Sequence, residues 1–144
     1  MFPTAKVIHI SRHGVDVAQS LQHRERSRKR GMRNKLFSAR CLSLEGAFTL
    51  WAEYEAMCLD VLEPIAPERK LQLRYEDLIT APREHLAEVL DFAGAVSTKT
   101  ILDKSPAVVE SNRAFAFRRK PELMRFFQQS RGHSMLQRYG YDQV

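Results

Sequence analysis

The sequence has little of several features that would assign it to a special class of protein. Its longest apolar runs extend over only a few residues, whereas a transmembrane helix needs about 20, so the pattern predicts no membrane span. Its first residues, MFPTAKVIHI, lack the basic, apolar and small-residue regions of a signal peptide. The two cysteines, Cys41 and Cys58, have no metal-like spacing and no disulfide framework around them. We therefore expect reduced thiols and a cytoplasmic location.

Glycine is also scarce, and its distribution excludes one kind of nucleotide site. The six glycines are dispersed along the chain, at positions 14, 31, 46, 94, 132 and 140. No glycine-rich loop with a lysine is present, and the P-loop kinases bind phosphate through such a loop. No internal repeat, low-complexity tract or second domain is evident either. A chain of 144 residues with 44% hydrophobic residues predicts a single domain with a real core over residues 1–144.

Positive charge is what the sequence has in excess. The formal net charge is +6, and the stretch from Arg24 to Arg40 holds eight Lys or Arg residues against one acid, Glu25. A basic balance favours acidic partners such as nucleotides, sulfated or carboxylated substrates, or nucleic acid. The block is either a solvated surface or one wall of a site for an acidic ligand. No nucleic-acid recognition motif accompanies it, so a nucleic-acid-binding module is not favoured.

The stretch from Lys6 to Leu21 predicts an anion site. It reads as a short buried strand over Lys6–Ile10, a turn carrying Arg12, and a helix that opens near Gly14. Backbone N–H groups and the positive end of a helix dipole converge at such a junction. A guanidinium fits two phosphate oxygens at once, and a helical side chain leans back toward the helix N-terminus. Arg12 and Ser20 are therefore candidates to hold a phosphate, and Asp16 is interpreted as structural, paired with Arg12 or with an amide donor.

The rest of the chain alternates helix and strand. A long helix is expected after Ser43, with Phe48 and Trp51 on its buried face, and Pro64 marks its end. A second strand is expected over 70–74, then a helix capped by Thr80 and closed by Gly94. A last helix is expected over 121–139. Alternating strands and helices indicate an α/β fold with a short parallel sheet.

Two separate motifs resemble the sulfotransferases that use 3′-phosphoadenosine 5′-phosphosulfate (PAPS). The segment RHGVDVAQS, from Arg12 to Ser20, is similar to the part of that family that binds the 3′-phosphate. The segment RYEDL, which contains Tyr75 and is followed by Pro82 and a helix, is similar to its second hallmark. The terminal RYGY is similar to the ending common in bacterial members. The resemblance implies that Arg12 and Ser20 hold the 3′-phosphate and that Tyr75 lies beside the adenosine.

The resemblance also implies a fold and an activity, and it shows which parts of the family's active site have no counterpart in this sequence. The fold is the helix-rich, P-loop-NTPase-like α/β fold of sulfotransferases, in part, and the activity is transfer of a sulfonate from PAPS to a hydroxyl or amine, without a metal. The family's glycine-rich 5′-phosphosulfate loop and its general base have no counterpart in this sequence, so no catalytic residue is assigned. We therefore expect the C-terminal portion of a sulfotransferase domain, one that supplies the 3′-phosphate and adenosine half of the cofactor site.

Two alternatives and one expectation about partners stay open at this stage. The chain is alternatively a basic nucleic-acid-binding module, or a nucleotide-binding protein without transferase activity. The acceptor is not identified by any motif, although a basic loop suits an acidic one. A sheet that lacks its first strand leaves an edge and apolar surface exposed, which is commonly covered by association. A homo-oligomer is therefore expected.

Overall fold

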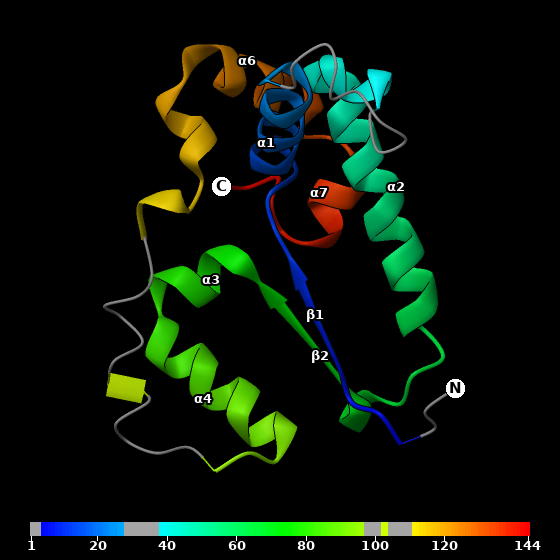
Figure 1. Ribbon diagram of the computed structural model, residues 1–144, viewed down its shortest axis with the longest axis vertical. Helices are drawn as coiled ribbons and strands as arrows, with labels where there is room; N and C mark the ends of the chain where they lie inside the picture. The colour runs from blue at the N-terminus through cyan, green and yellow to red at the C-terminus, as the bar shows by residue number, and fades with distance from the viewer. Residues whose placement is uncertain (1–3, 28–37, 97–101, 104–110) are drawn as a thin grey trace. The chain divides into compact units, whose positions relative to one another are not determined.

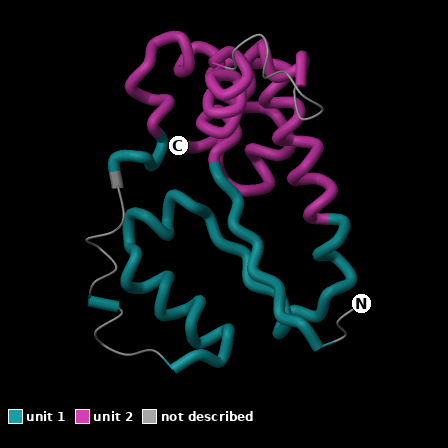
Figure 2. Tube along the Cα trace, in the orientation of Figure 1, with its two compact units in different colours: residues 1–12, 60–115 teal, residues 13–59, 116–144 magenta. Residues whose placement is uncertain are grey.

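The computed structural model describes residues 4–27, 38–96, 102–103 and 111–144. The chain divides into two compact units, which Figure 2 distinguishes by colour. The first unit combines Met1–Arg12 with Asp60–Phe115, and the second combines His13–Leu59 with Ala116–Val144. Each unit is described by itself below.

The first unit contains a parallel two-stranded sheet, as the alternation of elements predicts. Strand β1 (Val7–Ser11) pairs with β2 (Lys70–Arg74), and the two arrows run side by side in the same direction in Figure 1. The register pairs Val7 with Lys70 and Ser11 with Arg74. The second strand has the predicted bounds, whereas the first begins and ends one residue later than predicted. As a result, β1 ends at the residue directly before Arg12.

The prediction that β1 is a strand buried on both faces is wrong. Ile8 is 39% exposed and Ile10 is 47% exposed. Ile8 and Ile10 are two residues apart, so their side chains lie on the same face of the sheet, and this face is partly open to solvent. The apolar pattern correctly predicted a strand, but it could not reveal whether both faces of the strand are covered.

Two helices follow β2, and their caps correct one prediction. Helix α3 (Tyr75–Thr80) is followed by α4 (Pro82–Ala93). Thr80 does not cap α4: its Oγ1 donates to the carbonyl oxygen of Glu76 at 2.8 Å, and Ala81 is the N-cap residue. Pro82 opens α4 in the first turn, as predicted. Gly94 ends it in the left-handed conformation (φ 72°), which glycine adopts without strain. The short 3₁₀ helices η3 (Pro67–Arg69) and η4 (Ser111–Arg113) complete this unit.

The second unit is helical. Its elements are α1 (Gly14–Ser27), η2 (Ala39–Leu42), most of α2 (Leu44–Leu62), η5 (Ala116–Arg119), α6 (Pro121–Ser130) and α7 (Ser134–Arg138). Ser43 caps α2 as predicted, because its Oγ accepts a hydrogen bond from the Gly46 amide at 3.0 Å. The core combines residues from all of the longer segments. Its members include Val15, Ala18, Ala47, Phe48, Trp51, Phe117, Leu123, Phe127, Leu136 and Tyr141.

Gly14 marks a close approach within this unit. A Cβ atom at this position would overlap the indole ring of Trp51 and the ring of Phe48. The first turn of α1 therefore packs directly against α2, at a distance that only glycine permits. Trp51 is 4% exposed, which confirms its interpretation as a core residue, whereas Tyr54 on the same helix is 61% exposed.

The single C-terminal helix expected over 121–139 is wrong, because two helices occupy this range. Helix α6 ends at Ser130 and α7 begins at Ser134. His133 caps α7: its Nδ1 accepts a hydrogen bond from the Met135 amide at 3.2 Å. Tyr139, just after α7, donates to Glu55 Oε2 at 2.8 Å. Burial first, and then this hydrogen bond, raise the pKa of the Tyr139 hydroxyl.

Candidate functional site

The carboxyl ends of β1 and β2 bring the two sequence motifs together. Ser11 pairs with Arg74 in the last register position of the sheet, so the next residues, Arg12 and Tyr75, leave the sheet at the same edge. The guanidinium carbon of Arg12 lies 4.8 Å from the centroid of the Tyr75 ring. Such a cation–π contact stabilises by about 0.5–2 kcal/mol, more where the pair is shielded from water. The two candidate residues of this unit are therefore in contact, although they are far apart in the sequence.

A backbone contact adds to the orientation of Arg12. Its Nη2 donates to the carbonyl oxygen of Arg113 at 3.3 Å, within the same unit. The side chain of Arg12 is half-buried. Because a guanidinium is a rigid planar fork, this hydrogen bond and the contact with the Tyr75 ring restrict the direction in which it presents its N–H groups. A fork held in this way suits an anion with two accessible oxygens, such as a phosphate.

An ion pair fixes the turn that carries Tyr75. Arg74 Nε donates to Asp77 Oδ2 at 2.7 Å, and Arg74 Nη2 donates to Asp77 Oδ1 at 2.8 Å. This two-pronged bond joins the last residue of β2 to the first turn of α3. Tyr75 is the first residue of that helix, so its ring is positioned by a turn with little freedom. Arg74 and Asp77 of the RYEDL motif therefore have a structural role, in addition to the nucleotide-binding role expected for Tyr75.

Ser20 belongs to the other unit. It lies on the second turn of α1, and its side chain is exposed. Arg12 is the last residue of the first unit's opening segment, and Ser20 lies within the second unit. The hypothesis that both residues hold one phosphate therefore stays a prediction from the sequence.

Asp16 has the structural role that the sequence predicts, through amide donors. Its Oδ1 accepts from the Phe117 amide at 2.8 Å, and its Oδ2 accepts from the Ala116 amide at 3.1 Å. The carboxylate is 3% exposed. The Asp16 side chain joins the first turn of α1 to η5, because each of its two carboxylate oxygens accepts a hydrogen bond from a backbone amide at the start of that short helix. Its negative charge is thereby satisfied internally.

His13 is a residue that sequence reasoning missed. It is fully buried, its Nδ1 accepts from the Val15 amide at 3.3 Å, and its ring stacks on Phe117 at 4.3 Å between centroids. Edge contacts with Phe127 and Tyr141 surround it. The residue directly before a predicted helix start is a cap candidate, and that position was the available signal. The aromatic contacts come from distant segments and could not be predicted.

The basic block between Arg24 and Arg40 is described only at its ends. Positions 28–37, which hold most of its charges, lie outside the described residues. Arg24 pairs with Glu25 at 3.1 Å, and Arg26 Nε donates to the carbonyl of Leu42 at 3.1 Å. Arg40 makes two hydrogen bonds to Glu53, and these lower the pKa of the Glu53 carboxyl. The described basic residues therefore serve local contacts.

Comparison with known proteins identifies the family. The model of the sulfotransferase family matches residues 1–100 of this chain. The chain belongs to the sulfotransferase family. A solved structure, the sulfotransferase domain from the curacin biosynthetic pathway, is similar in fold, with a TM-score of 0.59 and 21% sequence identity. The similarity covers 90% of this chain and 54% of that chain, so this sulfotransferase-family chain spans about half the length of the solved domain. No curated protein matches it in sequence.

These comparisons confirm the predicted fold class. The chain has the helix-rich, P-loop-like α/β fold of a sulfotransferase domain, with a short parallel sheet. The solved domain supports the fold alone at this level of identity. Among the described residues, no helix has the length and apolar character needed to cross a membrane.

Proposed function

We propose that this chain takes part in sulfonate transfer from PAPS to a hydroxyl or amine acceptor. In this reaction the bond between sulfur and the bridging phosphate oxygen of PAPS breaks. A new bond from sulfur to the acceptor oxygen or nitrogen forms, adenosine 3′,5′-bisphosphate leaves, and the acceptor releases one proton. Membership of the sulfotransferase family supports the type of reaction. The donor follows from the resemblance of the Arg12 and Tyr75 motifs to the family's cofactor-binding segments.

The contact between Arg12 and Tyr75 is the observation that carries the proposal. A guanidinium 4.8 Å from an aromatic ring centre joins a group that binds phosphate to a group that stacks on a base. We assign the 3′-phosphate to Arg12 and the adenosine to Tyr75. Ser20 is a further proposed phosphate ligand, on the strength of its spacing from Arg12 in the sequence. The dispersed glycines offer no phosphosulfate loop, so this chain is assigned the nucleotide end of the cofactor and no catalytic residue.

Isothermal titration calorimetry with adenosine 3′,5′-bisphosphate tests the assignment. We expect the chain to bind this nucleotide more tightly than AMP, which lacks the 3′-phosphate. Arg12→Ala should weaken the bisphosphate by roughly 10- to 150-fold, the equivalent of about 1.5–3 kcal/mol for a charged hydrogen bond. AMP affinity should change much less, because it has no group for Arg12 to contact.

A matched arginine serves as the control. Arg83 lies in the same unit and pairs with Asp103 at 2.6 Å on the surface. Arg83→Ala should leave both affinities unchanged. Equal binding of AMP and the bisphosphate, or an equal effect of the two arginine variants, would refute the phosphate assignment.

A further inference from the structure

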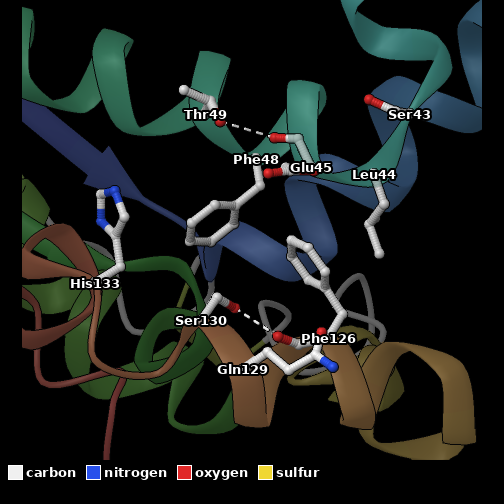
Figure 3. Close-up of a pocket in the computed structure, with 9 residues that line it drawn as sticks. All are labelled: Ser43, Leu44, Glu45, Phe48, Thr49, Phe126, Gln129, Ser130 and His133. Carbon is white, nitrogen blue, oxygen red and sulfur yellow. Dashed lines mark hydrogen bonds between the residues drawn. The ribbon is translucent and has the colours of Figure 1, made fainter.

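A pocket in the second unit lies outside the motifs that carry the sulfotransferase resemblance. It has a volume of about 560 Å³ and is formed by the start of α2, the end of α6 and His133. Figure 3 shows Phe48 extending from α2 and Phe126 from α6 toward the space between the two helices. A volume of this size falls in the range of small-molecule sites.

The apolar wall of the pocket is held by packing. The rings of Phe48 and Phe126 meet at 5.5 Å in an edge-to-face arrangement, and the His133 ring meets Phe48 edge-on at 5.3 Å. Phe48 is 4% exposed and contacts Trp51 in the core. Because these aromatic rings have fixed neighbours, the wall presents a preformed surface to an apolar ligand.

The hydroxyl groups around the pocket are used by the protein itself. Thr49 Oγ1 donates to the carbonyl of Glu45 at 2.9 Å, and Ser130 Oγ donates to the carbonyl of Phe126 at 2.7 Å; Figure 3 draws both bonds. His133 accepts at Nδ1, which leaves its hydrogen on Nε2 as a donor. No ion pair or hydrogen bond joins the Glu45 carboxylate to another residue that the structure describes. It is therefore the charged group that the pocket offers to a ligand.

The described residues that line the pocket differ in charge from the chain as a whole. The chain has a net charge of +6, yet none of the nine residues that line the pocket is Lys or Arg. Glu45, in the first turn of α2, is the carboxylate among the residues that line the pocket. Among the described residues that line the pocket, a negatively charged ligand meets no Lys or Arg, whereas a cation meets the Glu45 carboxylate beside an aromatic wall.

We propose that this pocket binds a small molecule with an aromatic or aliphatic body and a protonated amine. The body packs against Phe48 and Phe126, and the ammonium group contacts the Glu45 carboxylate. This inference concerns the second unit alone, and it does not depend on the proposed sulfonate transfer.

Three probes that share a phenylethyl body and differ in the charge of the head group test the proposal. Phenethylamine, phenethyl alcohol and 3-phenylpropionate are titrated into the full chain, and backbone amide shifts are followed by two-dimensional NMR. We expect the amine to bind most tightly and the carboxylate least tightly, with shifts concentrated at residues 43–49 and 126–133. Glu45→Gln should weaken the amine by roughly three- to tenfold, as expected for a partly exposed ion pair assisted by aromatic rings. The alcohol should be unaffected.

A second glutamate gives a matched control. Glu122 lies in the first turn of α6, as Glu45 lies in the first turn of α2, but it is outside the pocket. Glu122→Gln should leave all three affinities unchanged, and thermal melting of both variants checks that each is folded. Equal binding of the three probes, shifts in other regions, or an amine affinity that Glu45→Gln does not change would each overturn the proposal.

Discussion

At the scale of single residues, buried polar groups determine where the chain tolerates change. Asp16 is the clearest case, because its carboxylate is the acceptor for two backbone amides of η5. Its 3% exposure means that water cannot replace those bonds. The sequence indicated a structural role for Asp16, and the structure identifies its partners.

Removal of this carboxylate should destabilise the protein. In Asp16→Ala the amides of Ala116 and Phe117 lose their acceptor, and each buried unsatisfied group costs about 1–3 kcal/mol. We expect the free energy of unfolding to fall by roughly 2–4 kcal/mol, measured by urea denaturation. Asp60→Ala is the control, since Asp60 is exposed on α2. Equal stability of the two variants would contradict the structural role.

At the scale of elements, the contact between α1 and α2 depends on the absence of a side chain. An added methyl group at Gly14 would overlap the rings of Trp51 and Phe48. Trp51 and Phe48 are themselves 4% exposed, so neither ring can move aside without disturbing its neighbours. The start of α1 therefore requires glycine because of the close packing against α2.

Gly14→Ala should lower stability even though alanine favours helices. Overpacking typically costs about 1–3 kcal/mol, more than the roughly 1 kcal/mol that alanine gains over glycine in a helix. Gly132→Ala is the matched control, because a Cβ there meets no atom within 4 Å. We expect a lower melting temperature for Gly14→Ala alone. A melting temperature equal to that of Gly132→Ala would show that the rings can adjust.

Local signals in the sequence predicted where helices and strands lie better than they predicted which distant residues contact them. The strand over 70–74, the Ser43 cap and the Gly94 stop follow from residue types and short-range hydrogen bonds, so they could be predicted. The division of the last helix at His133 depends on a side-chain cap after α6 that the apolar pattern does not encode. The contact of Arg12 with Tyr75 depends on strand register. The two motifs could be recognised separately in the sequence, but only the structure shows that Arg12 and Tyr75 are in contact.

At the scale of the whole molecule, exposed apolar surface and net charge act against each other. Ile8 and Ile10 are 39% and 47% exposed on a strand that has β2 as its single partner among the described residues. Such an edge favours pairing with another chain. The net charge of +6 opposes association between identical chains, and dissolved salt screens that repulsion.

We therefore propose that the chain self-associates through β1, increasingly as salt is raised. Sedimentation velocity over a range of concentrations and salt should show a concentration-dependent increase in mass. Ile10→Lys should weaken the association by at least about tenfold, because burial of an isoleucine contributes about 1.5–3 kcal/mol. Val96→Lys adds the same charge at a residue that is 86% exposed in the same unit and should have little effect. A single monomeric species under all conditions, or equal effects of the two lysines, would refute association through this strand.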